Sequence, residues 1–143
     1  MLHVYALTVP ANTAKENPKT LDIEIDDDAL LFVAVRFPPG PQALAGVSLW
    51  YGEEQIFPYP KGSWVVGDNE VIWDFILWKC PERPCPLTIK AYNIDDTYSH
   101  TCYIRIVSCD KVVFYGLKGF GRLLAYLEAI VGLFVPFRGG RRW

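Results

Sequence analysis

Short segments of alternating apolar and polar residues fill the chain from residue 2 to about residue 115, separated by Pro, Gly, Asn and Asp. The clearest is residues 21–26, where Leu21, Ile23 and Ile25 share one face and three acids share the other. A period of two is that of a β-strand with one buried face, and no helical period occurs before residue 118. Eight or nine such strands predict an all-β fold, an antiparallel β-sandwich with jelly-roll-like topology.

Two strands are predicted to supply much of the core. Residues 29–37 are rich in Val, Leu and Phe, which indicates a strand buried on both faces. Residues 70–79 alternate along their whole length, and we expect Trp73 in the core with the residues of its face, Val71, Phe75 and Leu77. Further strands are expected at residues 46–51, 55–57, 63–66, 86–93, 97–108 and 111–115.

A different pattern begins near residue 118. Between Leu123 and Val135 the only charged residue is Glu128, so a helix here would be apolar on nearly every side and must be buried in something larger than its own domain. We therefore expect residues 1–116 to form the sandwich, and residues 117–143 to form a C-terminal apolar α-helix and basic tail for assembly. The predicted interface has helical spacing and comprises Phe120, Leu123, Leu124, Leu127, Ile130, Val131 and Phe134.

Several environments for this helix can be compared. A membrane span needs ~20 apolar residues, and this stretch offers about thirteen before Pro136. An interfacial membrane helix needs a basic polar face, which is missing. The remaining environment is burial of the helix against other copies of the chain or against a partner subunit. The alternative is that the helix packs across its own sandwich. Because Tyr126, Ala129 and Leu133 add a second apolar strip, we favour a helix held between two neighbours, as in a homotrimer.

The net charge argues against a nucleic-acid partner, and the first residues indicate the compartment in which the chain is made. The net charge is −2, and the basic cluster at residues 138–142 is short, so no nucleic-acid groove is expected. Residues 1–5 lack the positive start of a secretory signal, which predicts synthesis in a cytoplasm. Free thiols are the default in a cytoplasm. Disulfides between Cys80 and Cys85 and between Cys102 and Cys109 remain alternatives. The spacing of these cysteines does not fit a zinc site.

Catalytic chemistry has little support in the sequence. The two histidines, His3 and His100, lie in predicted strands, and no nucleophile, phosphate-binding or metalloprotease motif is present. We therefore expect no catalytic residue, metal or cofactor, and we interpret the acidic runs at residues 26–28 and 95–96 as solvated turns. Trp64 and Tyr59 lie in a Pro/Gly-rich loop and are the candidates for a sugar-stacking surface.

Several loop and strand phrases resemble those of small β-sandwich virion surface proteins of tailed bacteriophages. They cover residues 7–13, 37–40, 44–46, 55–58 and 93–100, within a resemblance of about residues 5–107. The resemblance implies a non-enzymatic virion structural protein of decoration, fibre or adaptor type, made in the host cytoplasm and assembled with itself and other virion proteins. The helix is not part of this pattern. The alternative function is a carbohydrate-binding module or adhesin that uses Trp64 and Tyr59.

Overall fold

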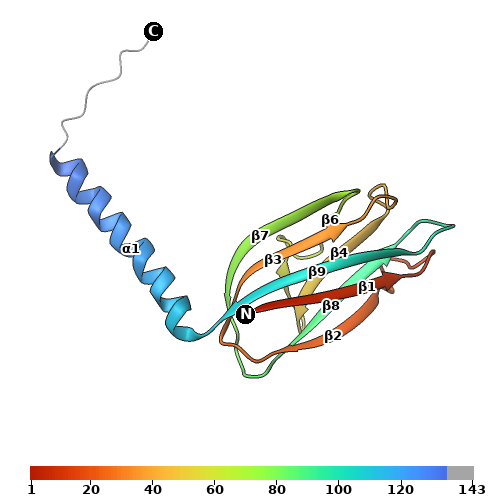
Figure 1. The fold of residues 1–143 in the computed structure, drawn as a ribbon, viewed down its shortest axis with the longest axis horizontal. Coiled ribbons are helices and arrows are strands. Elements are labelled where there is room, and N and C mark those ends of the chain that lie inside the picture. The colour runs from red at the N-terminus through yellow and green to blue at the C-terminus, as the bar shows by residue number, and fades with distance from the viewer. Residues whose placement is uncertain (135–143) are drawn as a thin grey trace, which may run out of the picture.

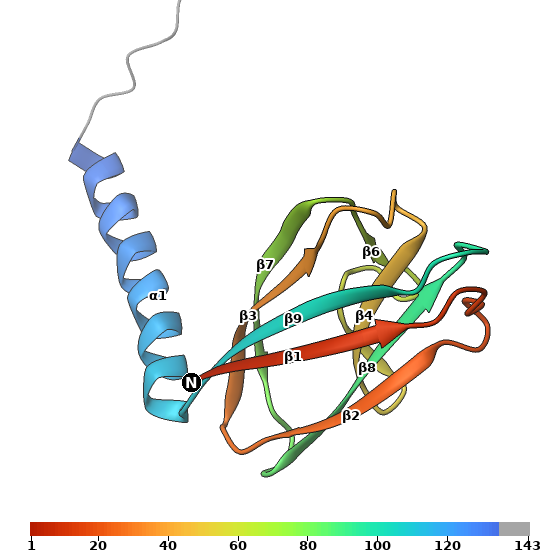
Figure 2. The same ribbon diagram turned by 45° about the vertical axis from the view of Figure 1, so that its right-hand side comes forward.

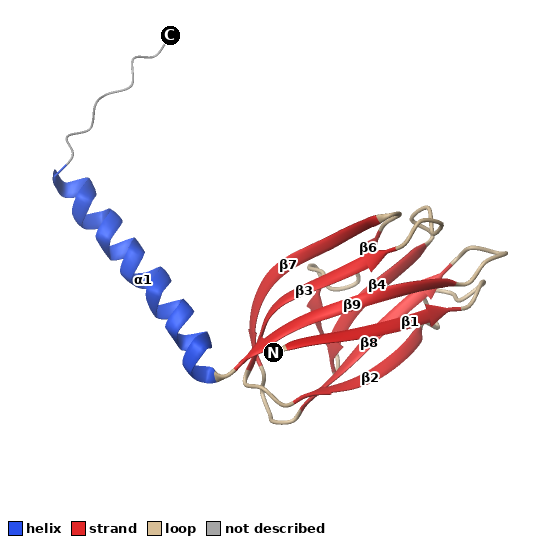
Figure 3. Cartoon of the chain, viewed as in Figure 1, coloured by secondary structure: helices blue, strands red, loops and turns tan. Residues whose placement is uncertain are grey.

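The computed structural model describes the backbone of residues 1–134 and the side chains of residues 1–131. Two antiparallel sheets pack face to face, and one helix leaves the end of the sandwich (Figure 1, Figure 3). The first sheet, here called sheet A, has the order β1 (Leu2–Val9), β9 (His100–Cys109), β3 (Ala29–Phe37) and β7 (Glu70–Lys79). The second, sheet B, has the order β2 (Lys19–Ile25), β8 (Cys85–Asn93), β4 (Ala45–Tyr51) and β5 (Glu54–Phe57), and β6 (Val65–Val66) also pairs with β4.

The strand pairing is nested. β1 pairs with β9, β2 with β8, β3 with β7 and β4 with β5, so the chain resembles one long antiparallel hairpin rolled into two layers. The rolled hairpin gains a second set of contacts, β3 with β9 and β4 with β8. This is a jelly roll, and it confirms the predicted fold class.

The inward residues of both sheets form the core. The alternation predicted the buried face correctly in β2, β8 and β9, and the central strand β3 is buried on both faces along much of its length. Burial of an apolar side chain of this size stabilises the fold by about 1.5–3 kcal/mol. The largest fully buried side chains are Phe37, Phe114, Ile25, Leu30, Leu49, Leu87, Ile89, Ile104, Ile106, Val9, Val33 and Val35.

The orientation of β7 differs from the prediction. Trp73 was expected in the core, but it is 56% exposed, and Val71, Phe75 and Leu77 are exposed with it. The opposite face of the strand packs on the core through Ile72, Ile76 and Trp78. Because β7 is an edge strand of sheet A, Asp74 can point towards the inner side and still reach water.

The helix begins earlier than predicted. Residues 111–115 were expected to be a strand, but they belong to α1 (Lys111–Phe134), and only Asp110 separates it from the end of β9 at Cys109. Asp110 caps it, since its carboxylate accepts a hydrogen bond from the Val113 amide at 2.9 Å. The Asp28 carboxylate accepts another from the Lys111 amide at 2.9 Å. Both bonds satisfy amides that the first helical turn leaves without partners.

Two further features concern the described residues as a whole. The helix of residues 111–134 is not long and apolar enough to cross a membrane. No cluster of His, Cys, Asp and Glu within the described part of the chain has the composition of a metal site.

Candidate assembly surface

The base of α1 is fixed to the outer side of sheet A. Phe114 is 2% exposed and packs with Ala29 and Cys109, against partly buried Leu31. The ammonium group of Lys79 lies 5.8 Å from the centre of the Tyr115 ring. These contacts hold the first turn, and the rest of the helix projects away from the sandwich (Figure 2).

Beyond its base, α1 is solvent-exposed. Eleven large apolar residues are between 45% and 74% exposed: Val112, Val113, Tyr115, Leu117, Phe120, Leu123, Leu124, Tyr126, Leu127, Ile130 and Val131. Six of the seven predicted interface residues belong to this group, and the side chain of Phe134 lies outside the described side chains. A monomeric soluble protein rarely exposes an apolar surface of this kind.

The large apolar residues of the helix are not spread evenly around its axis. At about 100° per residue, the large apolar residues occupy an arc of about 200°. The remaining arc includes Phe114 and continues along the helix with small and charged residues, Lys118, Gly121, Arg122, Ala125, Glu128 and Ala129. The apolar arc is therefore turned away from the side of the helix that contacts its own sandwich.

Sheet A presents a second exposed apolar surface. Paired residues on its outer side form three rows across the four strands: Leu2–Val107–Phe32–Phe75, Val4–Arg105–Ala34–Trp73 and Ala6–Tyr103–Arg36–Val71. The rings of Phe32, Trp73 and Phe75 cluster, with centroids 5.3–5.8 Å apart. We call these twelve residues the sheet A face. This face was not predicted from the sequence, because Trp73 and Phe75 were expected in the core.

The two aromatic residues proposed for sugar stacking lie in different surroundings. Tyr59 is 93% exposed. Trp64 is half-buried, with its ring edge-on to Tyr92 at 4.9 Å, where Gly46 leaves room for the Tyr92 ring. The side chain of Gln55 shapes the loop between them by bonding to Pro58, Gly62 and Ser63. Among the described residues no ring contact joins Trp64 to Tyr59.

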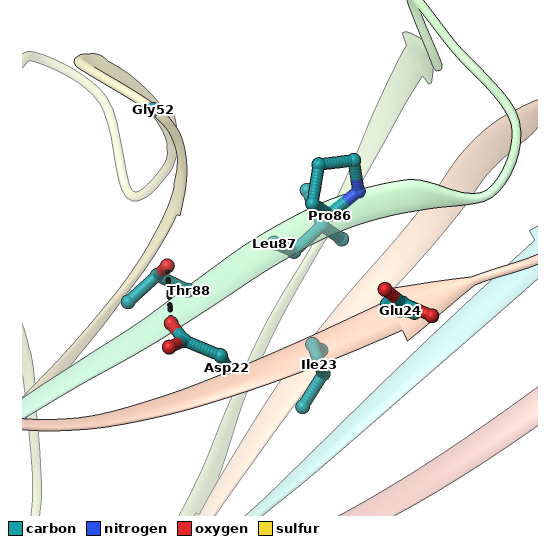
Figure 4. Close-up of a pocket in the computed structure, with 7 residues that line it drawn as sticks. All are labelled: Asp22, Ile23, Glu24, Gly52, Pro86, Leu87 and Thr88. Carbon is teal, nitrogen blue, oxygen red and sulfur yellow. Dashed lines mark hydrogen bonds between the residues drawn. The ribbon is translucent and has the colours of Figure 1, made fainter.

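An open pocket of about 480 Å³ lies over β2 and β8 (Figure 4). Its lining residues are Asp22, Ile23, Glu24, Gly52, Pro86, Leu87 and Thr88. The Thr88 hydroxyl donates to the Asp22 carboxylate at 2.8 Å. The charged groups of the lining are the two carboxylates of Asp22 and Glu24.

Both histidines bond to partners that the sequence did not reveal. The Ser108 hydroxyl lies 2.8 Å from Nε2 of His3 and donates to the Asp27 carboxylate. A nucleophilic serine would be accessible and would give its proton to the histidine, whereas Ser108 is 1% exposed and donates to the acid. Nε2 of His100 lies 2.8 Å from Oδ2 of Asp95 in a buried corner. Both histidines therefore have a hydrogen-bond partner within the fold.

The four cysteines are buried free thiols. Burial is the main cause that raises the pKa of Cys80 and of Cys102 to about 12 each, so both stay protonated near neutral pH. Cys80 and Cys85 lie close enough to hydrogen-bond. Cys102 and Cys109 lie seven positions apart on β9, about 23 Å along an extended strand, which excludes a disulfide between them within this fold.

Three of the phrases that carry the bacteriophage resemblance, residues 7–13, 37–40 and 93–100, meet at the end of the sandwich opposite the helix (Figure 1). The Asn12 amide donates to the Asp95 carbonyl at 2.9 Å, and Thr13 exchanges backbone bonds with Asn93. A Cβ added to Gly40 would lie 3.7 Å from the His100 ring. Three of the phrases therefore form one set of interlocked loops.

Comparisons with known proteins add little. No family model matches the sequence, and no curated protein matches it. A chain from the structure of infectious bursal disease virus, Gx strain, is similar over 75% of this chain, with 9% identity and a TM-score of 0.29. This chain spans 32% of that chain's length. The likeness is too slight to support an inference about function.

Proposed function

We propose that this protein is a non-enzymatic structural component of a virion, of capsid decoration, tail or fibre type, and that it assembles with itself through its C-terminal helix. The observation that carries the proposal is the exposed apolar arc of α1. Full burial of a large apolar side chain is worth about 1.5–3 kcal/mol, so covering one that is half exposed gains about half of that. A solvated helix with this surface would aggregate. A closed oligomer of three copies gives each helix two neighbours, which suits an arc of this width.

The virion setting rests on the resemblance of residues 5–107 to bacteriophage surface proteins. The jelly roll is compatible with it, since the fold recurs in viral capsid proteins. Jelly rolls also include lectins, so the fold alone does not separate a virion component from a carbohydrate-binding module.

The helix can be tested directly. Leu127→Asp combined with Ile130→Asp places two charges in the apolar arc, and light scattering should show the mass falling to that of a single 16.3 kDa chain. Lys118→Asp with Arg122→Asp is the matched control, because it changes the polar side of the same helix. If the first variant keeps the wild-type mass and still enters particles, the helix does not drive assembly.

The carbohydrate-binding alternative makes a different prediction. Saturable binding on a glycan array that Trp64→Ala or Tyr59→Ala abolishes would support it, especially if the helix variants bind equally well. Electron microscopy of the native particle with labelled protein would then decide where the protein is located.

A further inference from the structure

The sheet A face and the apolar arc of α1 are two uncovered surfaces on the same chain. On the sheet, Leu2, Val4, Val71, Trp73, Phe75 and Tyr103 are between 39% and 65% exposed. Side chains of this size and exposure present several hundred Å², comparable to the ~800 Å² that each partner contributes to a standard interface. We propose that the sheet A face receives the C-terminal helix of a neighbouring copy of this chain. This inference rests on the proposed self-assembly and specifies its contact.

A chain cannot cover its own sheet A face in this conformation. Phe114 and the Asp110 cap fix the helix base at the edge of the face, next to Ala29 and Cys109, and from there the helix points away (Figure 2). The side of the helix that continues from Phe114 carries small and charged residues, and the apolar arc is on the other side. Bending the helix back would release Phe114 and present its polar side to the sheet.

The dimensions of the two surfaces agree. From Leu2 to Ala6 the face extends about 14 Å along the strands, and it extends about 14 Å across its four strands, so its diagonal is about 20 Å. Residues 117–131 of the helix extend about 21 Å. Packing a helix on a sheet is one of the standard layer arrangements of proteins. The three aromatic rings are tilted 35–84° to one another, so they form an uneven surface for side chains to fill and not the flat platform that sugar stacking uses.

Charge supports the same pairing. The twelve residues of the face include two cations, Arg36 and Arg105, and no acid. Arg36 donates to Asn69, whereas Arg105 has no hydrogen bond or ion pair with any described side chain. The helix carries one acid, Glu128, one turn after Leu124 on the border of the apolar arc. If the helix packs on the sheet A face of the next copy through Leu117, Leu124 and Val131, its Glu128 lies near Arg105 of that copy.

Exchange of helices covers more surface than the other symmetric arrangements. Two copies joined through their sheet A faces would leave both helices in water. A bundle of helices alone would leave the aromatic cluster of Phe32, Trp73 and Phe75 uncovered. When each copy donates its helix to the next copy, one repeated contact covers both the sheet A face and part of the apolar arc. The rest of the arc, with Leu123, Leu127 and Ile130, can then form a helix–helix contact in a closed ring.

Directed cross-linking tests the contact. Protein with Phe75→Cys is mixed by co-refolding with a heavier, tagged protein that carries Leu124→Cys, and the mixture is oxidised and run on a non-reducing gel. We expect a disulfide-linked dimer of mixed mass. Thr20→Cys, exposed on sheet B, replaces Phe75→Cys in the control, and the native thiols are buried in both proteins. If the yield of mixed dimer is no higher than in the control, the proposal is overturned.

A charge exchange provides a second measurement. Arg105→Glu should weaken association by about fivefold, and adding Glu128→Arg should restore it, while circular dichroism stays unchanged because both positions are exposed. If Leu124→Cys cross-links only to itself and the charge exchange restores nothing, helix-driven assembly stands and docking on sheet A is wrong. If wild-type protein is monomeric at every concentration, the proposed assembly itself is wrong.

Discussion

At the scale of single residues, the loops opposite the helix depend on two polar side chains. Asn93 is fully buried, and its side chain donates to the carbonyls of Val9 and Tyr98 and accepts from the Asp95 amide. Asp95 in turn accepts hydrogen bonds from the amides of Thr97 and Tyr98 and bonds to His100. A buried polar group is tolerated only when its hydrogen bonds are made, so these two residues specify the loop conformation.

The Asp95 carboxylate makes the stability of this corner depend on pH. The amide of Thr97, and after it His100 and the amide of Tyr98, lower the pKa of Asp95 below its ordinary value of 3.8. A folded-state pKa below the unfolded one contributes stability above about pH 4, and that contribution is lost as the pH falls through the folded-state value. Asp95→Ala should therefore lower the Tm at neutral pH by several degrees, and the difference from wild type should shrink below about pH 4.

The neighbouring residue provides the control for this measurement. Asp96 is exposed, and its carboxylate accepts one bond, from the Thr97 hydroxyl. Asp96→Ala should change the Tm much less at every pH. Thermal unfolding followed by circular dichroism between pH 3 and pH 7 would contradict the assignment if the two variants behaved alike.

At the scale of elements, the helix depends on its first turn. Phe114→Ala removes a buried ring, a change that costs about 3–5 kcal/mol in a full core and less in this small cluster at the sheet edge. The expected result is loosening of the helix base with the sandwich intact: amide exchange in residues 111–118 should accelerate at least tenfold, while β3 and β9 stay protected. Lys111→Ala, on an exposed side chain of the same turn, should leave exchange unchanged.

The elements also show what periodicity can and cannot predict. In β2, β8 and β9 one face carries polar residues, so alternation identified the inner face correctly. In β7 both faces carry large apolar residues, and the face without Asp74, that of Trp73, was expected to be the inner one. That inference fails at a sheet edge, where a charge on the inner side can still reach water. The helix start at Lys111 was also missed. Val112 and Val113 are typical strand residues, and the cap is completed by Asp28, which is 83 positions away in the sequence.

At the scale of the whole molecule, the sequence predicted two layers of strands but not their pairing. Each row of the sheet A face joins residues from β1, β9, β3 and β7, which lie far apart along the chain. An exposed patch of this kind cannot be recognised before the register is known. The apolar helix is contiguous in sequence, so its large apolar residues could be named without the fold, and their role as an assembly interface stays a prediction. Its polar side was not predicted, because the prediction rested on the scarcity of charge between Leu123 and Val135, and small residues such as Ala125 carry no charge.

Self-assembly should couple folding to protein concentration. An interaction that only folded copies make stabilises them by mass action, so a tenfold rise in concentration adds about 1 kcal/mol, equivalent to a Tm increase of ~2–4 °C for a chain of this size. Leu127→Asp with Ile130→Asp should remove this dependence and leave the Tm of the dilute protein nearly unchanged, because both residues are about half exposed in the single chain. Scanning calorimetry over a hundredfold range of concentration measures both effects. A Tm independent of concentration in the wild type would mean that the apolar arc of α1 is covered by something other than copies of this chain.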